Sequence, residues 1–256
     1  MTWEKFNDTI ETVEKNIDTI IDEIILFQQT QTSLLRNNHY LVKDKDTQAV
    51  FESVLKKYQK KSAPNNHLKS YDLTHSGAKI SIKSGQVKNG NLKFSYSRTT
   101  EFNTLDKKID YLAAFDNLIL GLASEKIKIK ENNKNIISKT KYHLYYLPAD
   151  FIDIKNLEWL ETENMWQGKN KINNVNIDII KKMSDQPWIS IPTLLIPCRA
   201  ILTATVGSHN NRKYLIIDRM DTNQRIYFDL YTQRKKIRDL KGIEKCSPYT
   251  LKNAII

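Results

Sequence analysis

Two short β-strands joined by a tight turn most constrain how this chain folds. Residues 72–85 read Asp-Leu-Thr-His-Ser-Gly-Ala-Lys-Ile-Ser-Ile-Lys-Ser-Gly, and Ser76-Gly77 is a two-residue turn signal between alternating segments. A turn of that length places Asp72 opposite Ser81. Because side chains alternate along a strand, Lys83 points to the same face as Ser81.

The hairpin therefore predicts a carboxylate, a hydroxyl and an ammonium group side by side. A carboxylate can hold a divalent metal ion, and a nearby lysine can orient or activate a water that attacks phosphate. The same pattern is also typical of an ordinary hairpin with lysines on its solvated face, so other parts of the chain must distinguish the two interpretations.

The charge of the chain is large and unevenly distributed. The formal net charge is +11. Residues 1–26 hold two lysines against seven acids, a net charge of −5, which leaves +16 on the remaining chain. Such a one-signed charge favours a polyanionic partner, with nucleic acid as the first candidate. Membrane surfaces, acidic proteins and a lysine-rich surface that serves solubility are the alternatives.

The sequence gives no sign of a membrane or secreted protein. No apolar run approaches the roughly 18 residues needed to span a bilayer, and the first residues lack the pattern of a secretory signal. Cys198 and Cys246 stand alone, so no structural zinc site is expected and both fit a reducing compartment. We expect a cytoplasmic protein with no membrane contact.

Helical spacing of apolar residues predicts three long helices. The first covers 4–35, and the second covers 46–61 with Asp46 as its cap and Glu52 amid its apolar stripe. The third covers 104–122 and is capped by Asn103. A shorter helix is expected at 174–184. A breaker is predicted at 62–66 and a polar linker at 130–140.

Strand signals predict a sheet between and after these helices. The hairpin is followed by a strand at 92–97, reached through a turn at 88–90, and by another at 142–147. The final third is β-rich, with strands at 200–206, 213–218 and 225–231. The expected fold class is α/β (mixed α+β), a central mixed β-sheet flanked by helices.

The order of helix with Glu52, hairpin, strand and helix resembles the PD-(D/E)xK nuclease superfamily, and within it type II restriction endonucleases. Asp72 followed by Ser81-Ile82-Lys83 matches the metal-binding Asp and the acid-x-Lys motif on the next strand. Glu52 matches the acid often found on the preceding helix. The resemblance covers roughly 46–147 and implies a restriction-endonuclease-like core, with magnesium (Mg2+) as cofactor.

Two positions depart from the family pattern. Tyr71 stands before Asp72 in place of Pro, and Ser81 stands where an acid is expected. Ser81 is predicted to support the site by hydrogen bonding only. The missing carboxylate is expected from Glu101, with Asp106 and Asp110 as alternatives, or from Glu52 itself. The resemblance thus implies a catalytic group made of Asp72, Ser81, Lys83, Glu101 and Glu52, with Asp72, Glu101 and Glu52 as metal ligands.

Two basic regions are predicted to contact DNA. In the first, cations and aromatic residues interleave, and Lys88, Lys93, Tyr96 and Arg98 are the candidates. The second covers 199–238, which holds nine cations against three acids. Its loop contains Asn210, Asn211, Arg212 and Lys213, and Asn and Arg are the types that pair bidentately with adenine and guanine. An amphipathic strand and a polar hairpin turn are the alternative interpretations.

The sequence therefore predicts one nuclease domain over 1–256. A helical extension covers 1–45, the catalytic core 46–147, and a recognition and dimerisation part 150–256. The resemblance implies a type II site-specific deoxyribonuclease that cleaves double-stranded DNA as a homodimer, with a cognate DNA methyltransferase as genetic companion. The alternatives are a non-catalytic basic nucleic-acid-binding protein and a repair or structure-specific nuclease of the same superfamily.

Overall fold

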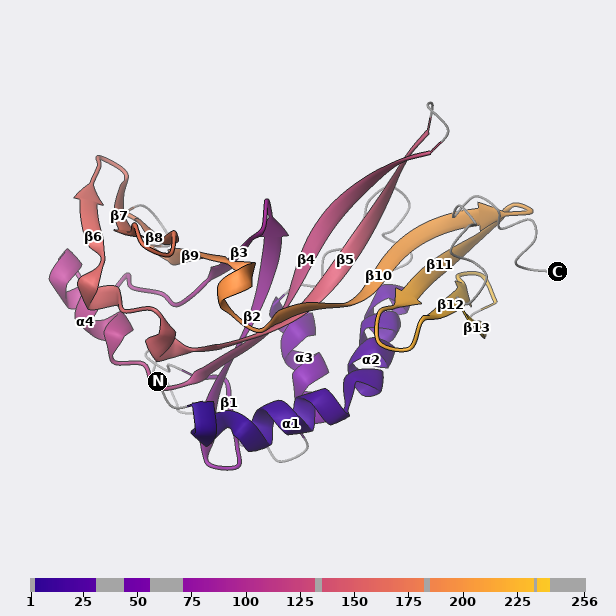
Figure 1. Ribbon diagram of the computed structural model, residues 1–256, viewed down its shortest axis with the longest axis horizontal. Helices are drawn as coiled ribbons and strands as arrows, with labels where there is room; N and C mark the ends of the chain where they lie inside the picture. Colours follow the sequence, from indigo (N-terminus) through magenta and orange to yellow (C-terminus); the bar gives the residue numbers. More distant parts are fainter. Residues whose placement is uncertain are drawn as a thin grey trace. The chain divides into compact units, whose positions relative to one another are not determined.

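The computed structural model of the chain is a mixed α+β structure with a large sheet and a few helices (Figure 1). It describes residues 3–30, 44–55, 71–131, 135–181, 185–232 and 234–239. The chain divides into two compact units. The first comprises Met1–Ile20, Lys43–Ala123 and Leu144–Cys198, and the second comprises Ile21–Val42, Ser124–His143 and Arg199–Ile256. No helix in the described part is long and apolar enough to cross a bilayer.

The N-terminal segment is helical, but the helix expected at 4–35 is interrupted. It consists of η1 (Trp3–Phe6), α1 (Asn7–Lys15) and α2 (Ile17–Thr30). The interruption falls at Asn16, whose side-chain amide donates to the Thr12 carbonyl at 2.7 Å. Such a local bond competes with helix continuation. The predicted residues 31–35 lie outside the described part.

The second helix, α3 (Asp44–Val54), begins two residues before the predicted cap. Asp46 therefore lies inside the first turn, which corrects its predicted role. Val50 and Phe51 of the apolar stripe are fully buried, and α3 packs on α1 and on strand β2 (Ala78–Lys88). The expected helical residues 56–61, the breaker at 62–66 and Cys246 lie outside the described part.

In the first unit the strands form an antiparallel sheet. Its order is β2, β3 (Asn91–Ser95), β9 (Pro187–Pro192), β8 (Val175–Ile180), β7 (Met165–Asn170) and β6 (Glu158–Glu161), and β1 (Leu73–His75) pairs with the start of β2. The strand predicted at 92–97 and the turn at 88–90 are thereby confirmed within one or two residues.

One face of this sheet is apolar because residues of matching register are apolar in every strand. The row across the strands consists of Phe94, Ile189, Ile177, Gly168 and Trp159. A Cβ added at Gly168 would lie 2.9 Å from the Trp159 ring, so this position must lack a side chain. The row forms part of the core of the unit.

Helix α4 (Leu105–Ala113) packs on this core and is shorter than predicted. Its N-cap is Thr104, not Asn103. Lys108 is buried on the helix, forms an ion pair with Asp185, and lies 4.9 Å from the centroid of the Trp166 ring. Burial lowers the pKa of Lys108, as expected when an ammonium group loses water.

Two further expectations are corrected by strands. Residues 118–122 belong to β4 (Leu118–Glu131), not to the helix expected at 104–122. Most of the linker expected at 130–140 belongs to β4 and β5 (Asn135–Pro148), and β5 contains the strand predicted at 142–147. The helix expected at 174–184 is β8, although its residues 182–184 lie outside the described part.

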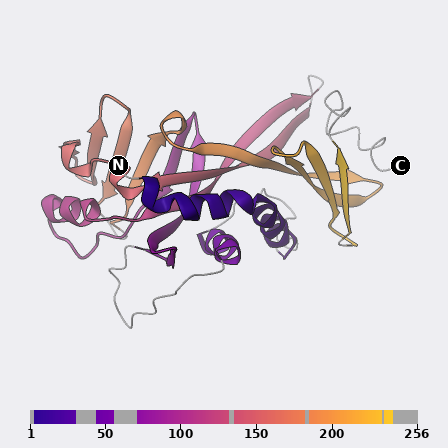
Figure 2. The same ribbon diagram turned by 60° about the horizontal axis from the view of Figure 1, so that its bottom comes forward.

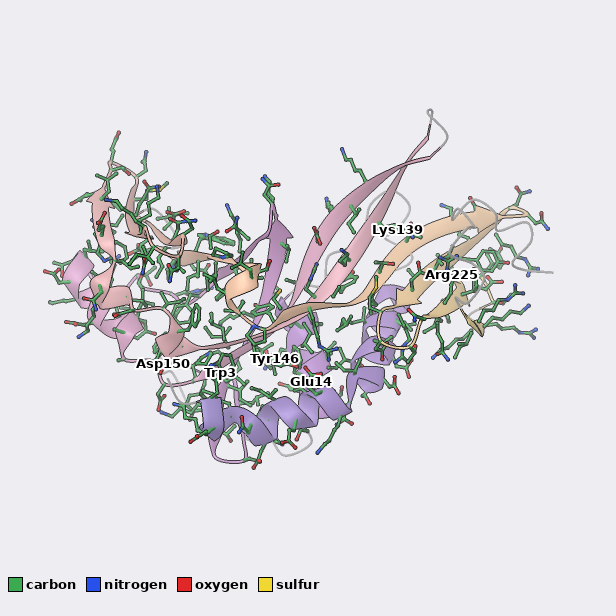
Figure 3. All side chains as sticks on the ribbon, in the orientation of Figure 1. Trp3, Glu14, Lys139, Tyr146, Asp150 and Arg225 are labelled. Atoms are coloured by element: carbon green, nitrogen blue, oxygen red, sulfur yellow. The ribbon has the colours of Figure 1, made fainter. Side chains whose placement is uncertain are left out.

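The short connections after β5 and β9 are 3-10 turns. They comprise η2 (Ala149–Phe151), η3 (Ile154–Asn156) and η4 (Thr193–Leu195). At the end of β5, Tyr146 and Glu14 of α1 point toward each other (Figure 3) and are hydrogen-bonded. This contact holds α1 against the sheet of the first unit.

In the second unit the predicted β-rich C-terminal third is confirmed. Its strand order is β13 (Lys235–Asp239), β12 (Gln224–Asp229), β11 (Arg212–Arg219), β10 (Cys198–His209), β5 and β4. Asp218 accepts two bonds from Arg225, at 2.5 and 3.1 Å, and lies 3.4 Å from Lys139. Burial would lower the pKa of Arg225, but the hydrogen bond and charge of Asp218 raise it overall.

Candidate active site

The hairpin of β1 and β2 has the predicted register. Ser76 and Gly77 both have positive φ, 47° and 79°, the backbone of the turn type that matches strand twist. Leu73 lies opposite Ile80, and the N–H of Asp72 donates to the Ile80 carbonyl at 2.8 Å. Asp72 lies one residue beyond this ladder, in a bend whose N–H bonds to the Ile80 carbonyl, so its position opposite Ser81 stays a prediction.

Ser81 and Lys83 share one face of β2, because alternate residues of a strand point the same way, and Asp72 is predicted to join them there. The other face carries His75, whose Nδ1 lies 3.1 Å from the Thr9 hydroxyl of α1. Figures 1 and 2 show α1 and α3 together on one side of β2. The helices therefore cover the face opposite to Ser81 and Lys83.

The carboxylate of Asp72 is fixed in orientation. Its Oδ2 accepts a hydrogen bond from the Ile82 N–H at 2.7 Å, and the side chain is half-buried. Within the described part, Oδ1 has no hydrogen-bond partner. An oriented carboxylate with one oxygen to spare suits a divalent cation.

Lys83 is held by its backbone rather than by its ammonium group. The Tyr145 hydroxyl donates to the Lys83 carbonyl at 2.9 Å. A Cβ added at Gly121 of β4 would lie 2.1 Å from the same carbonyl oxygen, so a glycine is required for β4 to approach β2. The half-buried Lys83 ammonium makes no ion pair with any described residue.

The predicted second carboxylates lie on other elements than the hairpin. Glu52 accepts a hydrogen bond from Gln48 at 2.8 Å on α3, the helix on the His75 side of β2. Glu101 is exposed in the segment between β3 and α4. That segment is tied to Asp185 by the backbone N–H and the hydroxyl of Thr99, on the β9 side of β3.

The alternative acids of α4 are both exposed. Asp106 lies in the first turn of the helix, and Asp110 forms an ion pair with Lys155 at 3.1 Å. Among the described residues, no group of three or more His, Cys, Asp or Glu is arranged to hold a metal ion. A metal site made by Asp72 with Glu52 or Glu101 stays a prediction.

The first basic region is exposed except at its aromatic residue. Lys88, Lys93 and Arg98 are exposed, as a DNA contact requires. Tyr96 is 2% exposed, and its ring packs edge-on against Phe115, 5.2 Å away. Burial raises its pKa. The predicted DNA contact of Tyr96 is therefore corrected, because this ring belongs to the core.

In the second basic region the predicted loop is a tight turn. Asn210 and Asn211 have φ of 47° and 62° and join β10 to β11. Both are exposed, as are Arg212 and Lys213. Arg212 lies 3.6 Å from Asp229, so its guanidinium is partly neutralised. The backbone of Asn210 and Asn211 fits the alternative interpretation, a polar hairpin turn. The exposure of all four side chains is also compatible with a contact to DNA.

One polar pair of the second unit was not expected from the sequence. Nε2 of His143 on β5 lies 2.8 Å from the Glu125 carboxylate on β4, and Lys141 lies 3.8 Å from the same carboxylate. Burial lowers the pKa of His143 despite the opposing effect of Glu125. The alternation of Lys139, Lys141 and His143 is the signal that would have predicted this strand.

Comparison of the chain with protein-family models, with curated proteins and with solved structures found no match. The hairpin and the charge of the chain are therefore the features that bear on function.

Proposed function

We propose that this protein is a magnesium-dependent endonuclease that cleaves double-stranded DNA at a short specific sequence, as type II restriction enzymes do. The observation that supports the proposal most is the hairpin, which brings the Asp72 carboxylate beside the strand that carries Ser81 and Lys83. Asp72 is oriented by the Ile82 N–H, and the Lys83 ammonium makes no ion pair in the described part of the chain. The hairpin thus presents an acid and a base without mutual neutralisation.

Each residue type has a defined task in phosphodiester hydrolysis. Asp72 would hold Mg2+ together with one further carboxylate, from Glu52 or Glu101. The metal, when bound, neutralises negative charge and supplies hydroxide near neutral pH. Lys83 would orient the attacking water and stabilise the charge that develops on the phosphate. Ser81, at 3% exposure, would only support this arrangement.

The surrounding charge fits a DNA substrate. The chain outside residues 1–26 carries +16, and Lys88, Lys93 and Arg98 are exposed in the same unit as the hairpin. Cations of this kind bind phosphates irrespective of sequence. Asn210, Asn211, Arg212 and Lys213 would contribute base contacts. We further propose a homodimer, a cytoplasmic location and a cognate DNA methyltransferase as companion.

Incubation of the purified protein with plasmid DNA and magnesium tests this proposal. Discrete fragments that require magnesium would support a sequence-specific endonuclease. A retarded but uncut plasmid, with no cleavage over a range of magnesium and manganese concentrations, would contradict it.

A non-catalytic nucleic-acid-binding protein is the second candidate. The exposed cations Lys88, Lys93 and Arg98 favour it, since they can bind phosphates without a metal site. In that case the retarded plasmid is the expected result, and Asp72→Ala leaves binding unchanged.

A further inference from the structure

The sheet of the second unit has two unlike faces across β10, β11, β12 and β13. An apolar row consists of Ala204, Ile217, Ile226 and Ile237. The adjacent row is polar and consists of Thr203, Asp218, Arg225 and Arg238. Asp22 of α2 forms an ion pair at 2.8 Å with Lys235, which alternates to the same face as Ile237. The polar row therefore lies on the face away from α2.

Arg225 and Arg238 lie directly opposite each other in the polar row. Like charges in this position repel, because the Cβ atoms of opposite residues are only about 4.5–5.5 Å apart. Asp218 engages Arg225 through two hydrogen bonds, at 2.5 and 3.1 Å. Arg238 makes no ion pair with any described residue. Lys236 is exposed two residues before it on the same face, opposite Tyr227.

Cations outnumber acids throughout this part of the sheet. Residues 206–216 and 224–239 hold seven cations and two acids, a net charge of 7 − 2 = +5. Three of these cations have acidic partners: Arg212 has Asp229, Arg225 has Asp218 and Lys235 has Asp22. The other four make no ion pair in the described part of the chain: Lys213, Arg234, Lys236 and Arg238. Asp239, the second of the two acids, is a single charge against these four.

The surplus of positive charge follows the outermost strand of the sheet. β13 stands at the end of the strand order, and Arg234, just before it, is exposed. Because a strand rises about 3.3 Å per residue, Arg234, Lys236 and Arg238 span about 13 Å. We call these three residues the basic ridge. Cations on an edge strand also prevent pairing with other chains, but that role does not require an arginine opposite Arg225.

A line of cations fits a polymer with regularly spaced charges better than a single small anion. Duplex DNA carries one negative charge per about 3.4 Å along each strand, so a ridge of this length can contact several phosphates. Lysine binds phosphate as a point charge, and arginine binds it through two parallel N–H groups. A phosphate beside Arg238 would also offset its repulsion from Arg225.

The basic ridge leads to the loop that is proposed to contact bases. The N–H of Leu230, in the turn before β13, donates to the Lys213 carbonyl at 3.0 Å. That turn and the Asn210-Asn211 turn therefore lie at the same end of the sheet. In protein–DNA complexes, phosphate contacts fix the position of the duplex and base contacts read its sequence. The arrangement suits both tasks on one surface.

We propose that the basic ridge of Arg234, Lys236 and Arg238 binds the phosphate backbone of double-stranded DNA irrespective of sequence. The ridge holds the duplex so that the Asn210–Lys213 loop reaches its bases. This inference rests on the proposed function for the choice of duplex DNA as the ligand. It requires neither magnesium nor cleavage.

Fluorescence anisotropy of labelled duplexes of several unrelated sequences, measured in EDTA over a range of salt concentrations, tests the proposal. Lys236→Ala and Arg238→Ala should each reduce the slope of log affinity against log salt by about 0.9, and the double variant by about 1.8. The reduction should be the same for every sequence, because the lost contacts are to phosphate. Lys236→Arg keeps the charge and should keep the slope.

Lys235→Ala is the matched control. It removes one positive charge from the same strand, but from the α2 face, where Asp22 already neutralises it. Its slope should equal that of the unmodified protein. Thermal midpoints of all variants establish that they are folded.

Three results would overturn the proposal. One is a folded double variant with the slope of the unmodified protein. Another is an equal reduction in Lys235→Ala, since net charge and not the ridge would then set the affinity. The third is an unmodified protein that binds vesicles of anionic lipid but no duplex.

This proposal and the nuclease proposal fail in different measurements. If the protein never cleaves plasmid but the ridge variants lose salt dependence, only the nuclease proposal fails. If magnesium-dependent cleavage occurs and the ridge variants bind as the unmodified protein does, only the ridge proposal fails.

Discussion

Replacing Asp72 separates its structural bond from its proposed chemical role. In the structure its Oδ2 accepts a hydrogen bond from the Ile82 N–H at 2.7 Å. Asp72→Ala removes the acceptor and leaves a backbone donor beside a side chain, Ile82, that is only 5% exposed. An unsatisfied donor of this kind costs about 1–3 kcal/mol, which corresponds to a fall in thermal midpoint of about 2–12 °C for a chain of this size.

Asp72→Asn retains an oxygen that can accept the Ile82 bond and removes only the charge. Its free energy of unfolding should therefore fall by about 1 kcal/mol or less, whereas its magnesium-dependent cleavage should fall at least about 100-fold, as that of Asp72→Ala does. The activity loss would then be independent of the stability loss. A hairpin with a structural role alone predicts that the Asn variant stays active.

The assay is the initial rate of loss of supercoiled plasmid at saturating magnesium, with the thermal midpoint measured on the same preparations. Asp116→Asn is the control, because Asp116 also pairs with β2, through Lys79 at 3.0 Å, but is exposed. That variant should cut normally. An Asp72→Asn protein that is folded and cuts at near the normal rate would refute the assignment of Asp72 as a metal ligand.

Four further changes give distinct outcomes. Lys83→Ala should abolish cleavage yet leave DNA affinity nearly intact, since it acts on transition-state charge; cleavage rates and gel shifts check this, and a normal rate contradicts it. Gly121→Ala should lower the thermal midpoint by about 2–12 °C, because the added methyl would lie 2.1 Å from the Lys83 carbonyl oxygen. An unchanged midpoint would show that β4 does not approach β2 closely at Gly121. Arg225→Ala should destabilise the protein by about 3 kcal/mol in denaturant titrations, because it removes both short hydrogen bonds to the partly buried carboxylate of Asp218 and leaves it only Lys139, 3.4 Å away, as an ion-pair partner. Arg225→Lys should restore part of this stability, and equal losses would argue against the pair. Arg212→Ala should weaken specific DNA binding by roughly 1–3 kcal/mol if Arg212 reads a base, or lower affinity for all sequences if it contacts phosphate; unchanged binding at several salt concentrations excludes both contacts.

Structural features that depend only on neighbouring residues could be predicted from the sequence. The hairpin register follows from Ser76-Gly77, because a two-residue turn fixes which residues face each other. The strands of the C-terminal third follow from alternation between turn signals, and Asn210-Asn211 forms the tight turn that such a pair favours. None of these features depends on a distant part of the chain.

The sequence did not determine whether short apolar runs form helices or strands. Residues 118–122, Leu-Ile-Leu-Gly-Leu, fit either a buried helix or a buried strand. The structure makes them a strand because Gly121 permits close approach to β2 and Tyr145 reaches across to the Lys83 carbonyl. Residues 175–180 read Val-Asn-Ile-Asp-Ile-Ile, in which apolar and polar side chains mostly alternate as in a strand. The helix predicted there was therefore wrong.

The sequence by itself determined the types of residue available for chemistry: an acid and a lysine on one hairpin, and a strongly basic chain. Only the tertiary structure decided their surroundings. It buried Tyr96, and it placed Glu52 on the helical side of β2. The physical reason is that burial and proximity depend on strand order and register between segments far apart in the chain, and no local pattern encodes these.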